Sequence, residues 1–590
     1  MNDYFVRNNV GHVRPTEGLP MKNIFFRASR VRTVFNLVAL AAAGLVSSST
    51  AEAATITQQA YLKASNTGSN DTFGASVAIS GGTAVVGARY ESSSATGVNS
   101  DENNDNAPRS GAAYVFEHSG ATWTQQAYLK ASNTRPGDEF GHSVAISGNT
   151  VVIGAPYEDK GGNGVNSSGS GVGIIDSGAA YIFVRNGANW TQQAYLKASN
   201  PGYQDYFGWS VAVSGDTAVV GAWSEDSSSG PADDNAPDSG AVYVFARNGT
   251  NWSQQAFLKA PVIRGGDVFG ASVAASGDTL LISAYRDGSG ATGVNGSWNN
   301  YAAPVSGAAY IFVRDGTSWK RQAYLKASNT EMNDLFGYTV AISGDTAVIG
   351  TFVEASSATG VNGNQSDNSA PESGAAYVFA RNGTNWSQQA YLKASNTKAR
   401  NYFGRSVGIS GDVVVVGAVQ ESSSATGVNS DQTNYGLSAQ GAVYLFARTG
   451  ITWTQQAYVK ASNTGTNDFF GAAVAISGNT VVATAPLEDS SATGVNGDQG
   501  NDSRGAAGAA YVFTGVCPAC TQLTIARNGS NGYVLRFQDA PNTLCCLQRA
   551  RHATGPWDAV ATLTTSPNGT LEFHDAEPPS DQVFYRVVQP

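Results

Sequence analysis

Cysteine is scarce in this chain. The 590 residues include four cysteines, and all of them lie late: Cys517, Cys520, Cys545 and Cys546. Disulfides therefore hold no part of the first 516 residues together. A zinc ribbon needs two separated C-x-x-C knuckles, which the adjacent pair breaks, and a thioredoxin-like site needs a βαβ context, which is lacking. In an exported chain we expect structural disulfides between the C-P-A-C and C-C segments.

Charged side chains are also scarce, at 14% of the chain, and acidic ones outnumber basic ones by 45 to 35. Nucleic-acid binding needs a basic face, so this composition argues against a nucleic-acid partner. With five histidines in all, a repeated histidine-based catalytic triad is excluded. Paired carboxylates from different parts of the chain stay open, because one sequence does not place them together.

Long apolar runs are missing apart from residues 35–46, about 12 residues that are too short to span a bilayer. A basic group precedes this run: Lys22, Arg27, Arg30 and Arg32. Ala-Glu-Ala follows it at 51–53, which completes the pattern of an export signal. We interpret residues 1–53 as a targeting segment, with Met1 or Met21 as its start. Its removal leaves 29 basic and 42 acidic side chains, a net charge of −13 and no transmembrane span.

A repeat dominates what is present. Phe-Gly pairs begin at Phe73, Phe140, Phe207, Phe269, Phe336, Phe403 and Phe470, at intervals of 67, 67, 62, 67, 67 and 67 residues. Seven copies at a nearly fixed period indicate a repeat architecture. The 68 glycines suit many short strands and tight turns.

Each repeat contains four strand-like runs, which in the first copy are 76–80, 83–88, 111–116 and 122–131. Ser-Gly-x-Thr separates the first two runs, and Asn-Gly or Asp-Gly recurs between the last two, which favours hairpins. Four antiparallel strands repeated seven times predict a seven-bladed β-propeller. A linear β-solenoid is the alternative, but its turns are usually shorter.

The repeats do not begin and end at the same point of the four-strand unit. The fourth run also appears at 55–65, before the first Phe-Gly, and no fourth run follows residue 513. We therefore expect residues 57–64 to pair with 508–513 and close the ring, which removes two exposed sheet edges. The predicted propeller spans 54–515, and a linker at 516–522 leads to 523–590, where short alternating runs predict a small β-sandwich resembling immunoglobulin or fibronectin modules.

Phe-Gly followed by Val-Val-Gly-Ala-Pro, kept as Gly154-Ala155-Pro156, resembles the FG-GAP repeat of integrin α subunits and bacterial surface proteins. The resemblance implies a cell-surface propeller with an adhesive role. Integrin blades carry an Asp-x-Asp-x-Asp-Gly calcium loop between their first two strands. Single aspartates stand there instead, at Asp216, Asp278, Asp345 and Asp412. One carboxylate does not supply the six to eight oxygens that calcium takes, so we expect no metal or other cofactor.

Antiparallel strands place the loops between strands two and three, and between one repeat and the next, on the same face. All length variation falls in the former loops, so we expect ligands to bind on this loop-rich face. The residues after Phe-Gly and after Gly-Ala differ most between copies. From these positions we select five candidate ligand residues: His142, Trp209, Trp223, Tyr338 and Arg405. Packing between blades is the interpretation we favour for them, and a ligand surface that stacks on sugars is the alternative hypothesis.

The loops between strands two and three are acidic. The first and last include Glu91, Asp101 and Asp105, and Glu488, Asp489, Asp498 and Asp502. Their spacing matches no calcium loop, so we interpret them as solvated rather than metal-binding.

The sequence thus predicts an all-β protein: a seven-bladed β-propeller closed by an N-terminal strand and followed by a small β-sandwich. We expect an exported or cell-surface binding or adhesion scaffold for an extracellular protein or carbohydrate, not an enzyme, with no catalytic residues assigned. A propeller-type polysaccharide hydrolase or lyase and a structural envelope protein are the alternatives.

Overall fold

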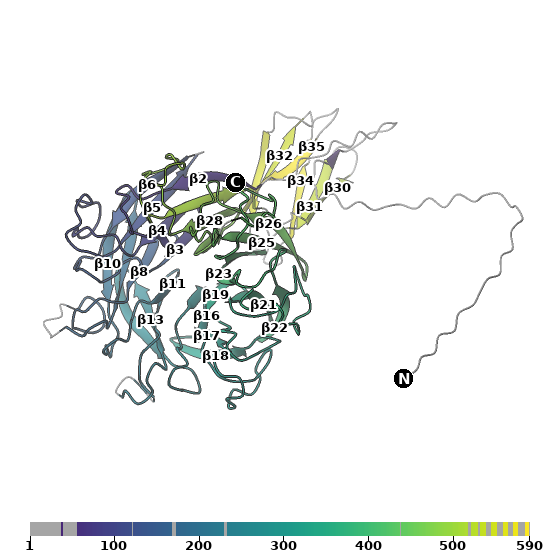
Figure 1. Cartoon of the computed structure of the whole chain (residues 1–590). Coiled ribbons are helices and arrows are strands. Elements are labelled where there is room, and N and C mark those ends of the chain that lie inside the picture. Colours follow the sequence, from purple (N-terminus) through teal and green to yellow (C-terminus); the bar gives the residue numbers. More distant parts are fainter. Residues whose placement is uncertain are drawn as a thin grey trace, which may run out of the picture.

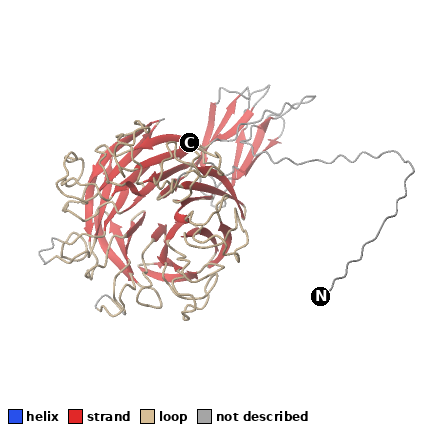
Figure 2. Ribbon diagram, viewed as in Figure 1, coloured by secondary structure: helices blue, strands red, loops and turns tan. Residues whose placement is uncertain are grey.

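The computed structural model describes residues 37–38 and 56–516, except 121, 168–172, 229, 231–232 and 437, together with six strands between 521 and 588. Figure 2 shows that these residues form strands and loops, with no helix. No helix able to cross a membrane therefore occurs among them. Most of the predicted targeting segment, Cys517 and Cys520 lie outside the described residues, as do the side chains of Cys545 and Cys546.

Seven four-stranded sheets are arranged around a common centre as the blades of a propeller (Figure 1). The first strands are β3 (Phe73–Ser80), β7 (Ser143–Ser147), β11 (Ser210–Ser214), β15 (Val273–Ser276), β19 (Thr339–Ser343), β23 (Phe403–Ser410) and β27 (Val474–Ser477). The second strands are β4 (Thr83–Ala88), β8 (Thr150–Ala155), β12 (Thr217–Ala222), β16 (Thr279–Ala284), β20 (Thr346–Thr351), β24 (Val413–Ala418) and β28 (Thr480–Ala485). Each first strand contacts the next, and β27 contacts β3, so the ring is complete.

The outer half of each blade is a longer hairpin. The third strands are β5 (Ala112–Ser119), β9 (Ala179–Asn186), β13 (Ala241–Asn248), β17 (Ala308–Asp315), β21 (Ala375–Asn382), β25 (Ala442–Thr449) and β29 (Ala509–Thr514). The fourth strands are β6 (Thr122–Leu129), β10 (Asn189–Leu196), β14 (Asn251–Leu258), β18 (Ser318–Leu325), β22 (Asn385–Leu392) and β26 (Thr452–Val459). In the seventh blade this place is taken by β2 (Thr57–Leu62), which pairs with β29 in antiparallel register.

Burial along each strand follows its place in the blade. In β4 all six residues of Thr-Ala-Val-Val-Gly-Ala are buried, because this strand is covered by neighbouring blades on both faces. The outer strand β6 alternates exposed and buried residues along its first half. The first two strands are joined by a two-residue turn that begins with glycine, whose φ at Gly81 is +55°. That left-handed conformation favours glycine because it has no Cβ.

The Phe-Gly pair packs the loop-rich end of each blade against its surroundings. Phe140 is buried, and its ring lies edge-on to Tyr181 and Phe183 of β9. Gly141 has φ of +90°, and a Cβ there would lie 2.2 Å from the Ala112 carbonyl oxygen of the preceding blade. The motif therefore has a structural role. The phenylalanine packs inside its own blade, and the glycine lets its backbone approach that of the preceding blade.

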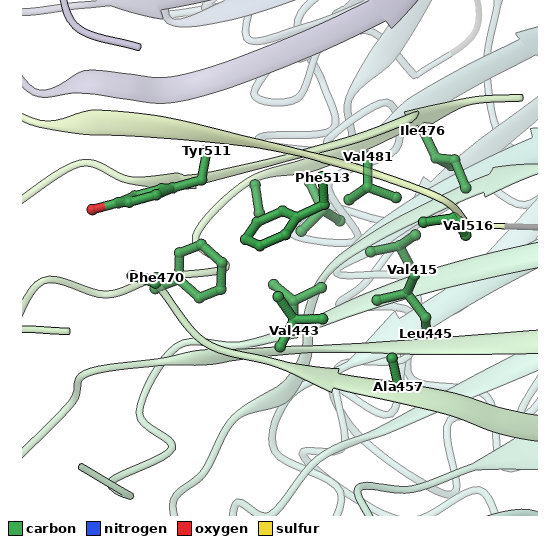
Figure 3. Packing of buried hydrophobic residues seen from close by; sticks show 14 of the residues in the cluster. Val415, Val443, Leu445, Ala457, Phe470, Ile476, Val481, Tyr511, Phe513 and Val516 are labelled. Carbon is green, nitrogen blue, oxygen red and sulfur yellow. The ribbon is translucent and has the colours of Figure 1, made fainter. Parts of the chain in front are cut away.

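The hydrophobic core lies between the blades. Seven buried clusters occur, and each joins residues from two neighbouring blades. Figure 3 shows one of them, in which Val415 and Leu445 of the sixth blade face Val481 and Phe513 of the seventh. A blade accordingly buries its apolar faces only against its neighbours, as in other repeat proteins.

The C-terminal strands form two separate sheets. One contains β30 (Thr521–Asn528), β31 (Gly532–Gln538) and β34 (Thr570–Asp575). The other contains β32 (Leu544–Ala550), β33 (Asp558–Thr564), β35 (Phe584–Val588) and the two-residue strand β1 (Leu37–Val38).

Candidate functional site

The loop-rich face is built by paired loops from neighbouring blades. The loop entering the second blade donates backbone hydrogen bonds to the loop of the first, from Glu139 N to Arg109 O at 3.1 Å and from Phe140 N to Ser110 O at 2.9 Å. Glu139 and Arg109 both have positive φ, and the equivalent residues of every blade do too. These bonds hold the side chains around each Phe-Gly pair in fixed positions.

Five aromatic rings from the second and third blades meet on this face. We call His142, Tyr157, Tyr206, Trp209 and Trp223 the tryptophan cluster. The centroids of the His142 and Trp209 rings are 4.5 Å apart, and those of Trp209 and Trp223 are 5.6 Å apart. Tyr206 stacks on Trp223 with an angle of 3° between the planes. All five side chains are partly exposed, so the cluster presents aromatic surface to solvent.

A second group spans the fourth to sixth blades. We call Tyr285, Tyr338, Phe352, Tyr402 and Arg405 the Tyr338 cluster. The rings of Tyr338 and Phe352 are 4.5 Å apart, and the Arg405 guanidinium lies 4.6 Å from the Tyr338 ring centroid. This distance permits a cation–π interaction.

Trp223 differs from the tryptophans of the repeat in its hydrogen bonding. Six tryptophans on the fourth strands each donate Nε1–H to a glutamine Oε1 of the preceding blade: Trp123, Trp190, Trp252, Trp319, Trp386 and Trp453. In the described structure the Nε1 of Trp223 is buried and has no hydrogen-bond partner. Trp223 therefore lacks the hydrogen bond that the six fourth-strand tryptophans make.

The five candidate residues thus fall into two groups. His142, Trp209 and Trp223 lie together, and Tyr338 lies with Arg405. The His142 side chain is 10% exposed, and its Nδ1 lies 3.5 Å from Glu139 Oε2. Burial lowers the pKa of His142, which opposes protonation at neutral pH.

Sequence reasoning missed Tyr157, Tyr206 and Tyr402. Tyr206 and Tyr402 directly precede Phe-Gly, a position that also varies between copies. That third variable position would have revealed both.

A family model described as the FG-GAP repeat matches residues 56–116, 123–183, 190–245, 252–312, 319–379, 386–446 and 453–513. The chain belongs to the FG-GAP repeat family. No curated protein matches the sequence. Among solved structures, the hydrazine synthase of Kuenenia stuttgartiensis is similar at 8% identity with a TM-score of 0.38, covering 72% of this chain and 94% of that one.

The acidic loops of this FG-GAP propeller begin with a carboxylate that is buried, not solvated. Glu91 Oε2 lies 2.8 Å from Lys130 Nζ, and Glu91 Oε1 accepts a hydrogen bond of 2.9 Å from the Tyr128 hydroxyl. The equivalent pairs are Glu158–Lys197, Glu225–Lys259, Asp287–Lys326, Glu354–Lys393, Glu421–Lys460 and Glu488–Lys63. The prediction of solvated loops was therefore wrong for Glu91 and Glu488, because each carboxylate neutralises a lysine inside its blade.

The other acidic residues considered for metal binding are dispersed. Asp101, Asp105, Asp498 and Asp502 are exposed, while Asp489 accepts a hydrogen bond of 2.8 Å from the Ala506 backbone. Within the described ranges no group of three or more His, Cys, Asp or Glu side chains is placed to hold a metal ion. The single aspartates of the first turns instead accept hydrogen bonds from arginines of the third strands: Asp216 from Arg247, Asp278 from Arg314, Asp345 from Arg381 and Asp412 from Arg448.

A second buried acid lies two residues before most Phe-Gly pairs. Burial, followed by the charge of Glu158, raises the pKa of Asp138 to about 8. The corresponding pKa values of Asp71, Asp205, Asp267, Asp334 and Asp468 are raised to about 7, first of all by burial. The sixth blade has Asn401 at this position, so an amide is compatible with the fold.

We expect the stability advantage of Asp138→Asn over the wild type to grow as pH rises from 5 to 8. The folded chain holds a proton on Asp138 that the unfolded chain releases near pH 4, so wild-type stability falls as pH rises through this window. The difference in unfolding free energy changes by up to about 1.4 kcal/mol per pH unit. Urea unfolding at several pH values measures it, and parallel curves for the two proteins would contradict the assignment.

Proposed function

We propose that this FG-GAP propeller is an exported or cell-surface binding module that takes a carbohydrate on its loop-rich face, at the tryptophan cluster and the Tyr338 cluster. The observation that carries the proposal is the tryptophan cluster itself. Trp209 and Trp223 are partly exposed and lie on one face with three further rings, and Trp223 lacks the glutamine partner of the six fourth-strand tryptophans. Aromatic faces of this kind stack on sugar rings and exclude water from them.

Comparison between blades supports a role beyond packing. The position of Trp209 is alanine in three blades, at Ala75, Ala271 and Ala472, and the position of Trp223 is valine at Val419. The propeller therefore forms without large side chains at either position. A ligand that contacts two neighbouring blades would account for the large rings at these positions in both of them.

We expect Trp209→Ala and Trp223→Val to abolish glycan binding while leaving the melting temperature within a few degrees of the wild type. Each variant copies a residue that another blade already carries. The measurement is a glycan array of neutral and acidic oligosaccharides, followed by calorimetry with the glycans that bind. We expect each variant to weaken binding at least tenfold.

Trp190→Ala is the contrasting variant, because Trp190 is buried between blades and donates its Nε1–H to Gln126. We expect it to destabilise the protein by about 3–5 kcal/mol. Unchanged glycan binding in folded Trp209→Ala and Trp223→Val proteins would refute the proposed site.

Three further parts of the organisation belong to this proposal. We infer that residues 1–53 direct export, that β2 closes the ring, and that the two C-terminal sheets form a β-sandwich. The signal-like composition of the N-terminus, the pairing of β2 with β29, and the two antiparallel sheets support them.

A further inference from the structure

An open surface cavity lies on the loops of the first blade, and one of its lining residues is the cation Arg109. Its volume is about 330 Å³, and it is lined by Ser69, Asn70, Tyr90, Ser92 and Arg109. The first two residues belong to the loop that enters the first blade, and the others to the loop between its second and third strands. The lining thus carries hydroxyl, amide and guanidinium groups.

The guanidinium groups of two arginines lie close to the Tyr90 ring. The guanidinium of Arg89 lies 4.7 Å from the Tyr90 ring centroid, and that of Arg109 lies 4.5 Å from it. Arg109 forms an ion pair with Glu139 and is 58% exposed, so part of its guanidinium is free to bind a ligand. The Nε of Arg89 is buried and has no hydrogen-bond partner, and among the described residues no ion pair involves Arg89. Two cations therefore lie beside Tyr90 in a protein whose net charge is −10.

The cavity is connected to the tryptophan cluster by direct contacts. Arg109 binds Glu139, Glu139 lies 3.5 Å from His142, and the His142 ring lies 4.5 Å from Trp209. One elongated ligand can therefore occupy both the cavity and the aromatic surface.

The two basic residues are not required by the repeat. The position of Arg109 is occupied elsewhere by Asp176, Asp238, Val305, Glu372, Ala439 and Ala506, all with positive φ like Arg109. The position of Arg89 is elsewhere proline, aromatic or valine. The first blade alone carries a cation at both positions.

We propose that this cavity binds the anionic group of an acidic oligosaccharide, whose adjoining sugar stacks on Trp209 and Trp223. Arg109 binds the carboxylate or sulfate, since a guanidinium forms paired, charge-assisted hydrogen bonds with such groups. Arg89, which lies against the lining residue Tyr90, adds positive charge beside it. Ser69, Asn70 and Ser92 bind hydroxyl groups of the same sugar. The proposal rests on the carbohydrate-binding function proposed above and assigns it a class of ligand.

The test compares acidic oligosaccharides with uncharged forms of the same backbone, using the full chain in calorimetry. The probes are oligogalacturonate, alginate and hyaluronan oligosaccharides with their carboxyl-reduced forms, and chondroitin sulfate with its desulfated form. We expect at least one acidic probe to bind tenfold or more tightly than its neutral form, with an affinity that falls as salt rises. Carboxylate and sulfate probes identify which anion is bound.

Arg109→Ala copies Ala439 and Ala506, and Arg89→Val copies Val419, so both variants are expected to fold. We expect each to remove the preference for the acidic form while neutral binding stays within about twofold. Glu139→Gln, which removes the competing carboxylate, is expected to strengthen acidic binding several-fold. Arg→Ala and Arg→Val variants that keep the preference, or a wild type without any preference, would overturn the acidic-ligand proposal.

The two proposals fail differently. Loss of all binding in Trp209→Ala with no acidic preference in the wild type refutes only the anionic site. Unchanged binding of every probe in Trp209→Ala and Trp223→Val refutes the carbohydrate site itself.

Discussion

Deleting residues 1–64 is expected to destabilise the propeller by about 6–10 kcal/mol, whereas deleting residues 1–55 leaves its stability unchanged. The longer deletion removes β2, which carries two fully buried side chains, Tyr61 and Leu62. Burying each contributes about 1.5–3 kcal/mol. It also removes Lys63 and leaves the Glu488 carboxylate buried without its cation, which costs about 3–5 kcal/mol.

The shorter deletion is the matched control, because it retains β2 and all its contacts. Urea unfolding of both truncated proteins measures the difference, and light scattering reports association through the exposed edge of β29. An open edge of this kind pairs readily with other chains, so we expect the longer deletion to aggregate. Equal stability of the two truncated proteins would show that the ring does not depend on β2.

Lys130→Met is expected to destabilise the protein by about 3–5 kcal/mol, because the Glu91 carboxylate is then left buried and unpaired. Lys130 donates hydrogen bonds to Glu91 at 2.8 Å and to Ser110 at 2.7 Å, and its side chain is fully buried. Denaturant unfolding measures the loss.

The double variant Glu91→Gln, Lys130→Met is expected to recover most of this loss, since it removes both charges. Lys320→Met is the control, because Lys320 is 68% exposed and pairs with the exposed Asp315. We expect it to change stability by less than about 1 kcal/mol. A Lys130→Met protein as stable as the control would refute a structural role for the buried pair.

Local patterns in the sequence predicted much of the scaffold. The run 83–88 coincides with β4, because its β-branched residues lie between two turn signals that act locally. The runs at 76–80 and 111–116 are shorter than β3 and β5 as the structure has them. β3 begins at Phe73, whereas the equivalent β7 begins at Ser143, although Phe140 and Gly141 pack as Phe73 and Gly74 do.

The buried ion pairs could have been inferred from the repeats. Lysine recurs after every fourth run and an acid three residues after every Gly-Ala or its equivalent, and a charge that recurs in every blade indicates a structural role. A single pair such as Glu91 and Lys130 is 39 residues apart and resembles two surface charges. Only the tertiary structure shows that the Glu91 and Lys130 side chains are both buried.

By itself the sequence determined the number of blades, the strands of each blade and the family, since these follow from a period and from residue types that act over a few positions. Tertiary structure decided which variable residues meet. His142 approaches Trp209, and Arg109 approaches Glu139, because neighbouring blades bring together loops that are distant along the chain. The candidate site is therefore a property of blade adjacency: the sequence identifies positions that vary, and packing around the ring determines which of them form one surface.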